Sequence, residues 1–116
     1  MMKIVNRKEF LAMPPETLFS KYEPCYFGPL EIKGESLDND FCAQQLVDAI
    51  ACKDSGEFAD LLFLAETQGT SIQLDFNCQY RDGCFDEDQL FAVWERDDVA
   101  ALIDRLARVI APHHEG

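Results

Sequence analysis

The chain of 116 residues lacks the features that identify several common classes of protein. Its five cysteines are an odd number without a CxxC pair, so neither a disulfide framework nor a zinc ribbon is predicted. We expect buried, reduced thiols, with Cys84, which follows a turn, as the one candidate for exposure. No run of about 18 apolar residues is present, and the start "MMKIVNRKEF" has no apolar stretch of signal-peptide length. The sequence therefore predicts a protein that crosses no membrane and stays in the cytoplasm.

Motifs for catalysis and for cofactor binding are also missing. The sequence has no GxGxxG, no phosphate loop and no HExxH, and its two histidines lie in a polar tail, which leaves the thiols without an evident base. In the acidic stretch "RDGCFDEDQLFAVWERDD", Asp82 is followed at once by Gly83, and residues 86–88 are three consecutive acids. The alternating ligand positions of an EF-hand are therefore absent. We predict no enzymatic activity, no cofactor and no metal site.

Basic residues are scarce, and the charge that results is unevenly distributed. Ten Lys and Arg stand against 22 Asp and Glu, which gives a net charge of −12. Residues 34–98 hold sixteen acids and only three bases, whereas residues 1–33 and 99–116 are nearly balanced. Such a field repels phosphate backbones and attracts basic surfaces. The charge therefore predicts a basic protein partner and no direct nucleic-acid binding.

Apolar residues, in contrast, are plentiful, at 47% of the chain with nine Phe. A globular chain of this length buries roughly two-thirds of the surface that its unfolded form exposes, so it can form a core without disulfide bonds or structural metal ions. The sequence predicts a single compact domain over residues 1–116.

Four segments carry helix signals. Asn6 and Glu9 have capping-box spacing, Val5 and Phe10 fit a hydrophobic staple, and Pro14 ends this first short helix. The other predicted helices span about 39–52, 54–69 and 96–111, each with an acidic or amide cap and apolar residues at helical spacing.

Three segments carry strand signals. Residues 17–34 are rich in aromatic and β-branched residues and hold two prolines, which predicts two short strands that lie at a sheet edge or carry a bulge. In residues 71–80 apolar and polar side chains alternate strictly, which predicts a strand with one buried face. The following "RDG" predicts a hairpin turn, with "QLFAVWE" as the returning strand. The fold class predicted is α+β, a small antiparallel sheet with helices packed on one face and an amphipathic C-terminal helix.

The leading functional hypothesis is that an acidic face engages a basic host protein, possible roles being anti-defence and nucleic-acid mimicry. The residues proposed for this face are Asp82, Asp86, Glu87, Asp88, Glu95, Asp97 and Asp98. A structural explanation competes with it, because acids are favoured at helix N-termini by the dipole and a charged turn keeps a hairpin soluble.

Two further hypotheses stay open. A small-ligand or nucleotide-binding pocket would use aromatic and lysine side chains, namely Phe19, Lys21, Tyr22, Tyr26, Phe27 and Lys33. An interaction module whose acidity only maintains solubility would instead present a large apolar patch, for example to a second copy in a homodimer.

Two blocks, "KEFLAMPPETLFSKYEPCYFGPLEIKG" and "RDGCFDEDQLFAVWERDDVAALIDRL", resemble segments of small, uncharacterised proteins encoded by bacteriophages and prophages. The resemblance covers about half of the chain and includes no catalytic motif. It implies an accessory protein in the cytoplasm of a bacterial host, where small acidic phage proteins often act by occupying host machinery such as defence systems.

Overall fold

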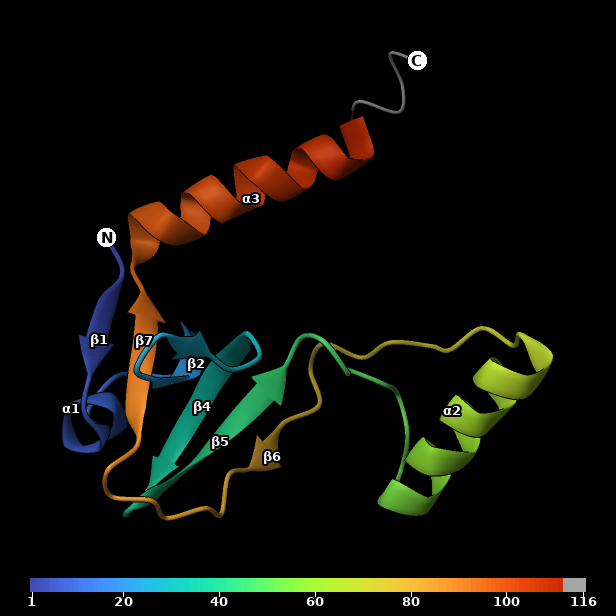
Figure 1. Cartoon of the computed structure of the whole chain (residues 1–116), viewed down its shortest axis with the longest axis horizontal. Coiled ribbons are helices and arrows are strands. Elements are labelled where there is room, and N and C mark those ends of the chain that lie inside the picture. The colour runs from blue at the N-terminus through green and yellow to red at the C-terminus, as the bar shows by residue number, and fades with distance from the viewer. Residues whose placement is uncertain (112–116) are drawn as a thin grey trace.

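One antiparallel sheet forms the centre of the computed structural model, which describes residues 1–111 (Figure 1). The strand order is β1-β7-β2-β4-β5-β6, with β3 paired to β2. The strands are β1 (Lys3–Val5), β2 (Thr17–Glu23), β3 (Tyr26–Phe27), β4 (Glu31–Leu37), β5 (Asp40–Gln45), β6 (Tyr80–Arg81) and β7 (Leu90–Trp94). The helices are α1 (Arg7–Leu11), α2 (Ser55–Gln68) and α3 (Arg96–Ile110). The predicted α+β class is confirmed.

The short helix α1 forms as its capping signals predict. The Asn6 side chain accepts a hydrogen bond from the Glu9 N–H at 2.8 Å, and the Glu9 side chain accepts one from the Asn6 N–H at 3.1 Å. A helix of five residues is not stable alone, so it depends on packing. Phe10 supplies that packing, because its side chain is fully buried against the sheet.

The core is a cluster of four phenylalanine rings on the face of the sheet that α1 covers. The Phe10 ring stacks on Phe91 at a centroid distance of 4.0 Å and lies 4.7 Å from Phe19 and 5.0 Å from Phe41. All four side chains are fully buried. These rings bring together α1, β2, β5 and β7, so one side chain of the helix connects three strands.

The strands predicted in residues 17–34 are present as β2 and β4. The predicted edge position is wrong for both, but β4 has the irregularity predicted as the alternative, a register shift against β5 between Lys33 and Ser36. β2 pairs with β4 on one side and with β7 on the other, and β4 lies between β2 and β5. Both prolines, Pro24 and Pro29, lie in the connection between the strands. The strands therefore keep their N–H groups, and each can pair on both sides.

The helix predicted over residues 39–52 is wrong, because the segment begins with strand β5. Asp38 takes a left-handed backbone conformation with φ 55, which turns the chain so that β5 pairs back onto β4. Asp and Asn tolerate this conformation better than most residues, so "LDND" carries a turn signal. Phe41 and Ala43 then enter the core on one face of the strand, and this packing overrides the helical spacing of the apolar residues.

The strand predicted over residues 71–80 is also wrong for most of its length. Only its last residue, Tyr80, belongs to β6, and Leu74 makes a single bridge with Ile50. The alternating apolar side chains remain exposed, with Leu74 at 46% and Phe76 at 51%. Alternation predicts which residues share a face, but here the segment runs past the end of β5, where the sheet offers no layer to cover that face.

The strand β7 forms where "QLFAVWE" predicts it, but its partners differ from the predicted hairpin. Gly83 has φ 68 and turns the chain after β6. β7 then crosses to the other half of the sheet and pairs with β1 and β2.

The two long helices, α2 and α3, begin at their acidic caps. Asp54 accepts a hydrogen bond from the Glu57 N–H at 2.8 Å, and Gly69 ends α2 with φ 70. In α3 the cap residue is Glu95, and its N–H donates to the Asp98 carboxylate at 2.9 Å.

Neither long helix buries a residue, so the predicted packing of helices on the sheet is seen only for α1. α2 extends to one side on its connecting segments, and α3 leads away from the end of β7 (Figure 1). The radius of gyration is 16.5 Å, whereas a compact chain of this length has about 13 Å. The apolar stripes of both helices are left without a covering layer from the described chain.

The thiols are free, as expected, but not buried. Cys25, Cys78 and Cys84 are exposed, while Cys42 and Cys52 are half-buried. Cys84, the exception, is exposed after the turn at Gly83. The expectation of burial is wrong for Cys25 and Cys78, because both lie in connections outside the helices and strands, which run over the surface.

A buried carboxylate joins β5 to the turn after β6. The Asp40 side chain is fully buried and accepts hydrogen bonds from Arg81 Nε at 2.7 Å and from the Gly83 N–H at 2.9 Å. Burial raises the pKa of Asp40, but the hydrogen bonds from Gly83, Arg81 and Phe41 outweigh it and hold the pKa below its usual value.

This depressed pKa predicts a pH dependence of stability. The contribution of Asp40 is present above its unfolded pKa of about 3.9 and is lost as the pH falls through the lower folded pKa. Asp40→Asn should therefore make the free energy of unfolding fall less steeply than in the wild type below about pH 4. Urea unfolding between pH 2 and pH 6 measures this, with Asp60→Asn, an exposed acid of α2, as the control. Parallel curves for wild type and Asp40→Asn would contradict the assignment.

Candidate functional site

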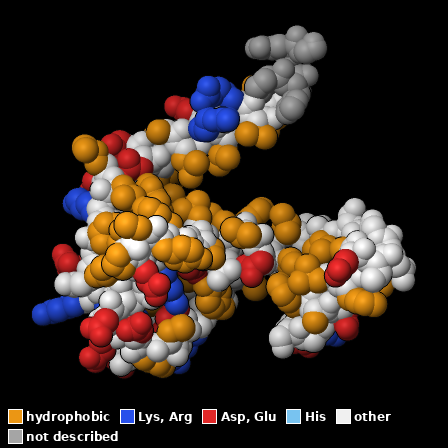
Figure 2. Space-filling model, viewed as in Figure 1, with side chains coloured by type: hydrophobic (Ala, Val, Ile, Leu, Met, Phe, Trp, Pro, Cys, Tyr) orange, Lys and Arg blue, Asp and Glu red, His pale blue; other side chains and the backbone are white. Residues whose placement is uncertain are grey.

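The most extensive uncovered feature is the apolar stripe of α3. Helical spacing places its apolar side chains on one face, and the stripe consists of Val99, Leu102, Ile103, Leu106, Val109 and Ile110. Ile103 is 60% exposed, Leu106 55% and Ile110 69%. An amphipathic helix normally buries such a stripe against a core. Figure 2 shows hydrophobic side chains along the edge of α3 that faces the sheet and α2.

The base of α3 forms a groove with the end of the sheet, which we call the α3 groove. It consists of two clefts of about 370 and 510 Å³ that share Leu18 and Trp94. The first cleft is lined further by Leu30, Asp98, Ala101 and Leu102. The second is lined further by Met13, Pro14, Glu16, Thr17, Val93, Glu95, Arg96 and Val99.

The two residues that both clefts share, Leu18 and Trp94, form the floor of the α3 groove and lie on the face of the sheet opposite the phenylalanine core. The second cleft also reaches Val93 of the core. Phe19 enters the core, so its neighbour Leu18 points to the other face. Leu18 pairs with Trp94 on one side and with Ile32 on the other, which places three large apolar side chains side by side across three strands. All three are only partly buried. The apolar stripe of α3 therefore continues onto an apolar strip of the sheet.

One group of the predicted acidic residues lies where β7 passes into α3. Glu95 and Asp97 accept hydrogen bonds from the Met1 amino group at 3.0 and 2.8 Å, and Lys3 Nζ lies 3.2 Å from Glu95. Hydrogen bonding to the Met1 ammonium lowers the pKa of both carboxyls, and for Glu95 the Lys3 ammonium adds to the effect. Asp98 is 24% exposed and lines the α3 groove, so carboxylates border its apolar floor.

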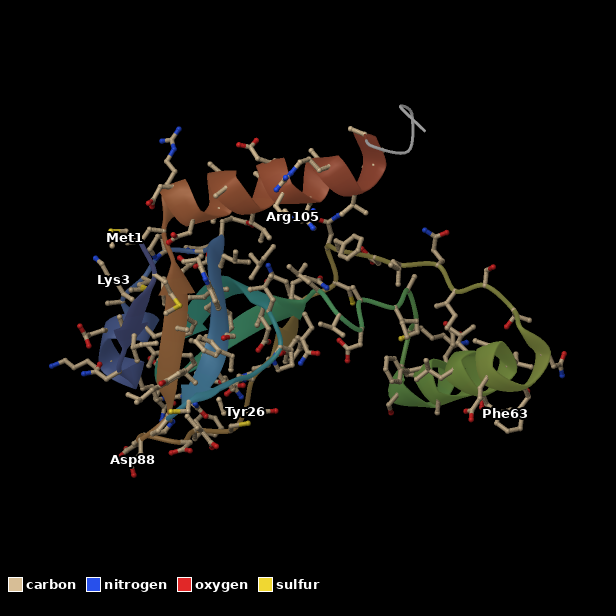
Figure 3. The ribbon with its side chains drawn as sticks, turned by 45° about the horizontal axis from the view of Figure 1, so that its top comes forward. Met1, Lys3, Tyr26, Phe63, Asp88 and Arg105 are labelled. Carbon is tan, nitrogen blue, oxygen red and sulfur yellow. The ribbon has the colours of Figure 1, made fainter. Side chains whose placement is uncertain are left out.

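A second group, Asp86, Glu87 and Asp88, lies in the connection that precedes β7, at the opposite end of that strand. All three are exposed. Figure 3 shows Asp88 at one end of the sheet and Met1 at the other, beside the start of α3. The structure therefore places the predicted acidic face as two separate groups.

Asp82 lies outside both groups. Its side chain is only 3% exposed and forms an ion pair with Lys21 Nζ at 2.5 Å. Burial alone would lower the pKa of Lys21, but the hydrogen bond and the charge of Asp82 outweigh it and raise that pKa. Asp82 is a structural partner of Lys21 and is not available to a basic protein.

The aromatic and lysine side chains predicted to line a pocket are divided between the two faces of the sheet. Phe19 belongs to the core, and Lys33 is fully buried, where its ammonium group donates to Met13 O, Gly34 O and Ser36 Oγ at 2.8–3.1 Å. Burial lowers the pKa of Lys33. With Lys21 paired to Asp82, neither lysine is placed to meet a phosphate.

The remaining three members of that set lie on the surface. Tyr22 and Phe27 contact each other at a centroid distance of 5.2 Å, and Phe27 lies 6.3 Å from Trp94. Tyr26 is 65% exposed and points away from the body of the molecule (Figure 3). Tyr22 and Phe27 therefore extend the apolar surface beside the α3 groove and do not enclose a ligand.

Sequence reasoning missed Leu18, Leu30 and Ile32 as members of a binding surface. The signal was present, because Leu18 and Ile32 are apolar neighbours of core-facing positions in strands, which makes both faces of the sheet apolar. This second apolar face of the sheet has no covering layer among the residues that the structure describes.

Comparisons of the chain with protein-family models, with curated proteins and with solved structures gave no match. Within residues 1–111, no helix combines the length and the apolar character needed to cross a membrane.

Proposed function

We propose that the protein is a non-enzymatic binding module that accepts a basic segment of a partner protein in the α3 groove. The observation that carries the proposal is the uncovered apolar stripe of α3, continuous with the Leu18–Trp94 floor. Contiguous exposed apolar surface of this kind marks interaction sites in soluble proteins. Its size and elongated shape suit a helical segment, whose side chains at every third or fourth position fill such a groove.

The charge around the groove favours a basic partner. Three acids, Glu16, Glu95 and Asp98, line it with a single base, Arg96, and the chain carries a net charge of −12. Acidic groups at the rim of an apolar groove guide a basic segment during encounter and exclude acidic ones. The resemblance of the sequence to phage proteins supports looking for this partner among proteins of a bacterial cytoplasm, including defence proteins.

Leu106→Glu should abolish partner binding without unfolding the chain. Leu106 lies in the middle of the stripe and is 55% exposed, so a glutamate there destroys apolar contact but breaks no core packing. Ala107→Glu is the matched control, because it adds the same charge to the same helix about 100° away from Leu106. Immobilised wild type, Leu106→Glu and Ala107→Glu are compared for proteins retained from a bacterial lysate at low and high salt, identified by mass spectrometry.

The expected result is a basic protein that wild type and Ala107→Glu retain at low salt, that high salt weakens, and that Leu106→Glu does not retain. Equal retention by all three proteins would contradict the role of α3. Light scattering of the purified chain tests the alternative occupant. A wild-type dimer that Leu106→Glu converts to a monomer would show that the stripe pairs with a second copy instead of a basic partner.

A further inference from the structure

A cleft separate from the α3 groove lies at the edge of the sheet beside the segment 46–79. This segment leaves the sheet after β5, contains α2 and returns at β6. Its volume is about 310 Å³, and it is lined by residues of β5, of the segment after β5, of the first turn of α2 and of the segment that leads to β6. Backbone hydrogen bonds fix its walls, from the Ala51 N–H to Gln73 O at 2.9 Å and from the Asp75 N–H to Ala49 O at 2.7 Å. The volume is at the lower end of the range for small-molecule sites.

A buried hydrogen-bond acceptor in this cleft has no donor. Gln44 is 4% exposed, and its Nε2 donates to Gln45 O at 2.6 Å. Its Oε1 is buried and receives no hydrogen bond from any described residue. Buried acceptors without a donor are rare, because such a group gives up its hydrogen bonds to water on folding and gains none in return, which lowers the stability of the folded state. A ligand N–H that enters the cleft would supply the missing donor.

The other polar groups of the cleft are also suited to a ligand that donates. Asp48 presents an exposed carboxylate to the cleft. The Tyr80 hydroxyl is already engaged, because it donates to the buried Glu31, and the side-chain oxygen of Gln45 lies 3.2 Å from it. The Nε2 of Gln45 donates to the Asp48 carboxylate at 2.6 Å. Burial raises the pKa of Glu31, and it also raises that of Tyr80. Gln44 Oε1 therefore remains as an acceptor without a donor, and the Asp48 carboxylate, which can accept about four hydrogen bonds, has free positions for a ligand.

The apolar walls and the charge limit the ligand further. Phe58 from α2 and Tyr80 from β6 both line the cleft, and their aromatic surface suits a flat ring. No Lys or Arg lines the cleft in the described part of the chain, and Asp54 and Glu57 lie near its Cys52. A phosphate group would meet only negative charge there.

We infer that this cleft binds a neutral, amino-substituted heteroaromatic ring, a nucleobase or nucleoside without phosphate. The exocyclic amine donates to Gln44 Oε1 and to the Asp48 carboxylate, and the ring lies against Phe58 and Tyr80. This site differs in place and chemistry from a nucleotide pocket at residues 19–33, and it does not depend on the α3 groove.

Isothermal titration of the full chain with adenosine, guanosine and cytidine tests the inference, with purine riboside and AMP as paired probes. At least one amine-bearing nucleoside should bind. Purine riboside lacks the exocyclic amine, and AMP adds a phosphate, so each should bind at least about tenfold more weakly than adenosine if adenosine is the ligand. Gln44→Met, which keeps the size of the side chain but removes the acceptor, should weaken binding by a similar factor.

Asp48→Asn provides the second variant, because Asp48 is exposed and its replacement leaves the fold intact even if Gln44→Met unfolds the chain. It should also weaken binding. The inference is overturned if none of the three nucleosides binds at millimolar concentration, if AMP binds as tightly as adenosine, or if neither variant changes the affinity of a nucleoside that binds.

Discussion

Phe10→Ala should lower the free energy of unfolding by about 3–5 kcal/mol, the largest effect expected for a single substitution in this chain. Phe10 is fully buried and contacts the rings of Phe19, Phe41 and Phe91 at centroid distances of 4.0–5.0 Å. Truncation leaves a cavity among these rings and removes the side chain that holds α1 to the sheet. Since small domains are stable by only about 5–15 kcal/mol, much of the total stability depends on this contact.

Phe63→Ala is the matched control for this prediction. Phe63 lies in α2 and is 62% exposed (Figure 3), so the same truncation removes no core contact. Its effect on stability should stay within about 0.5 kcal/mol. Urea unfolding followed by far-UV circular dichroism measures both variants, with an unchanged dependence on urea as evidence that the unfolded state is the same. A loss for Phe10→Ala no larger than that for Phe63→Ala would show that the phenylalanine cluster is not the core.

Local signals predicted three of the four expected helices, because helix caps depend on residues close in sequence. Asn6 with Glu9 and Asp54 with Gly69 mark helix ends that the structure confirms. Such caps form hydrogen bonds to backbone groups within one helical turn, so four or five consecutive residues are enough to recognise them.

Strand predictions failed where the deciding contact was distant in sequence. Residues 39–52 have helical spacing, but pairing with β4 and the entry of Phe41 into the core decide the conformation of the segment. Residues 71–80 have perfect strand alternation, but most of them lack a neighbouring strand. Strand formation depends on a partner and a covering layer, which a local pattern does not specify.

The candidate site was predictable in its chemistry but not in its location. The sequence indicated acids near the start of α3 and the apolar stripe of α3, and both lie at the α3 groove. It did not indicate that β7 separates Asp86 and its neighbours from Glu95, nor that Asp82 turns inward to Lys21. Composition gives the charge of a region, whereas the direction of each carboxylate depends on sheet register.

Lys21→Met should lower the free energy of unfolding by about 3 kcal/mol, because it leaves a buried carboxylate without its counterion. The Asp82 side chain is 3% exposed and lies 2.5 Å from Lys21 Nζ. Burial raises the pKa of Glu31, and the charge of Lys21 opposes this shift, so a second buried acid also loses a favourable neighbour. Lys3→Met is the matched control, because Lys3 is 61% exposed and pairs with Glu95 at the surface. Exposed pairs contribute only about 0–1 kcal/mol.

The double variant Lys21→Met with Asp82→Asn separates an uncompensated charge from lost packing. Asn keeps an oxygen that can accept from the Cys84 N–H, the bond that Asp82 accepts at 3.2 Å, but it carries no charge to bury. The double variant should therefore be more stable than Lys21→Met alone, and urea unfolding of the four proteins forms a complete cycle. If Lys21→Met costs no more than Lys3→Met, or if Asp82→Asn fails to restore stability, then Asp82 is not the buried charge that Lys21 neutralises. In that case Asp82 would again be a candidate for the acidic surface that meets a basic partner.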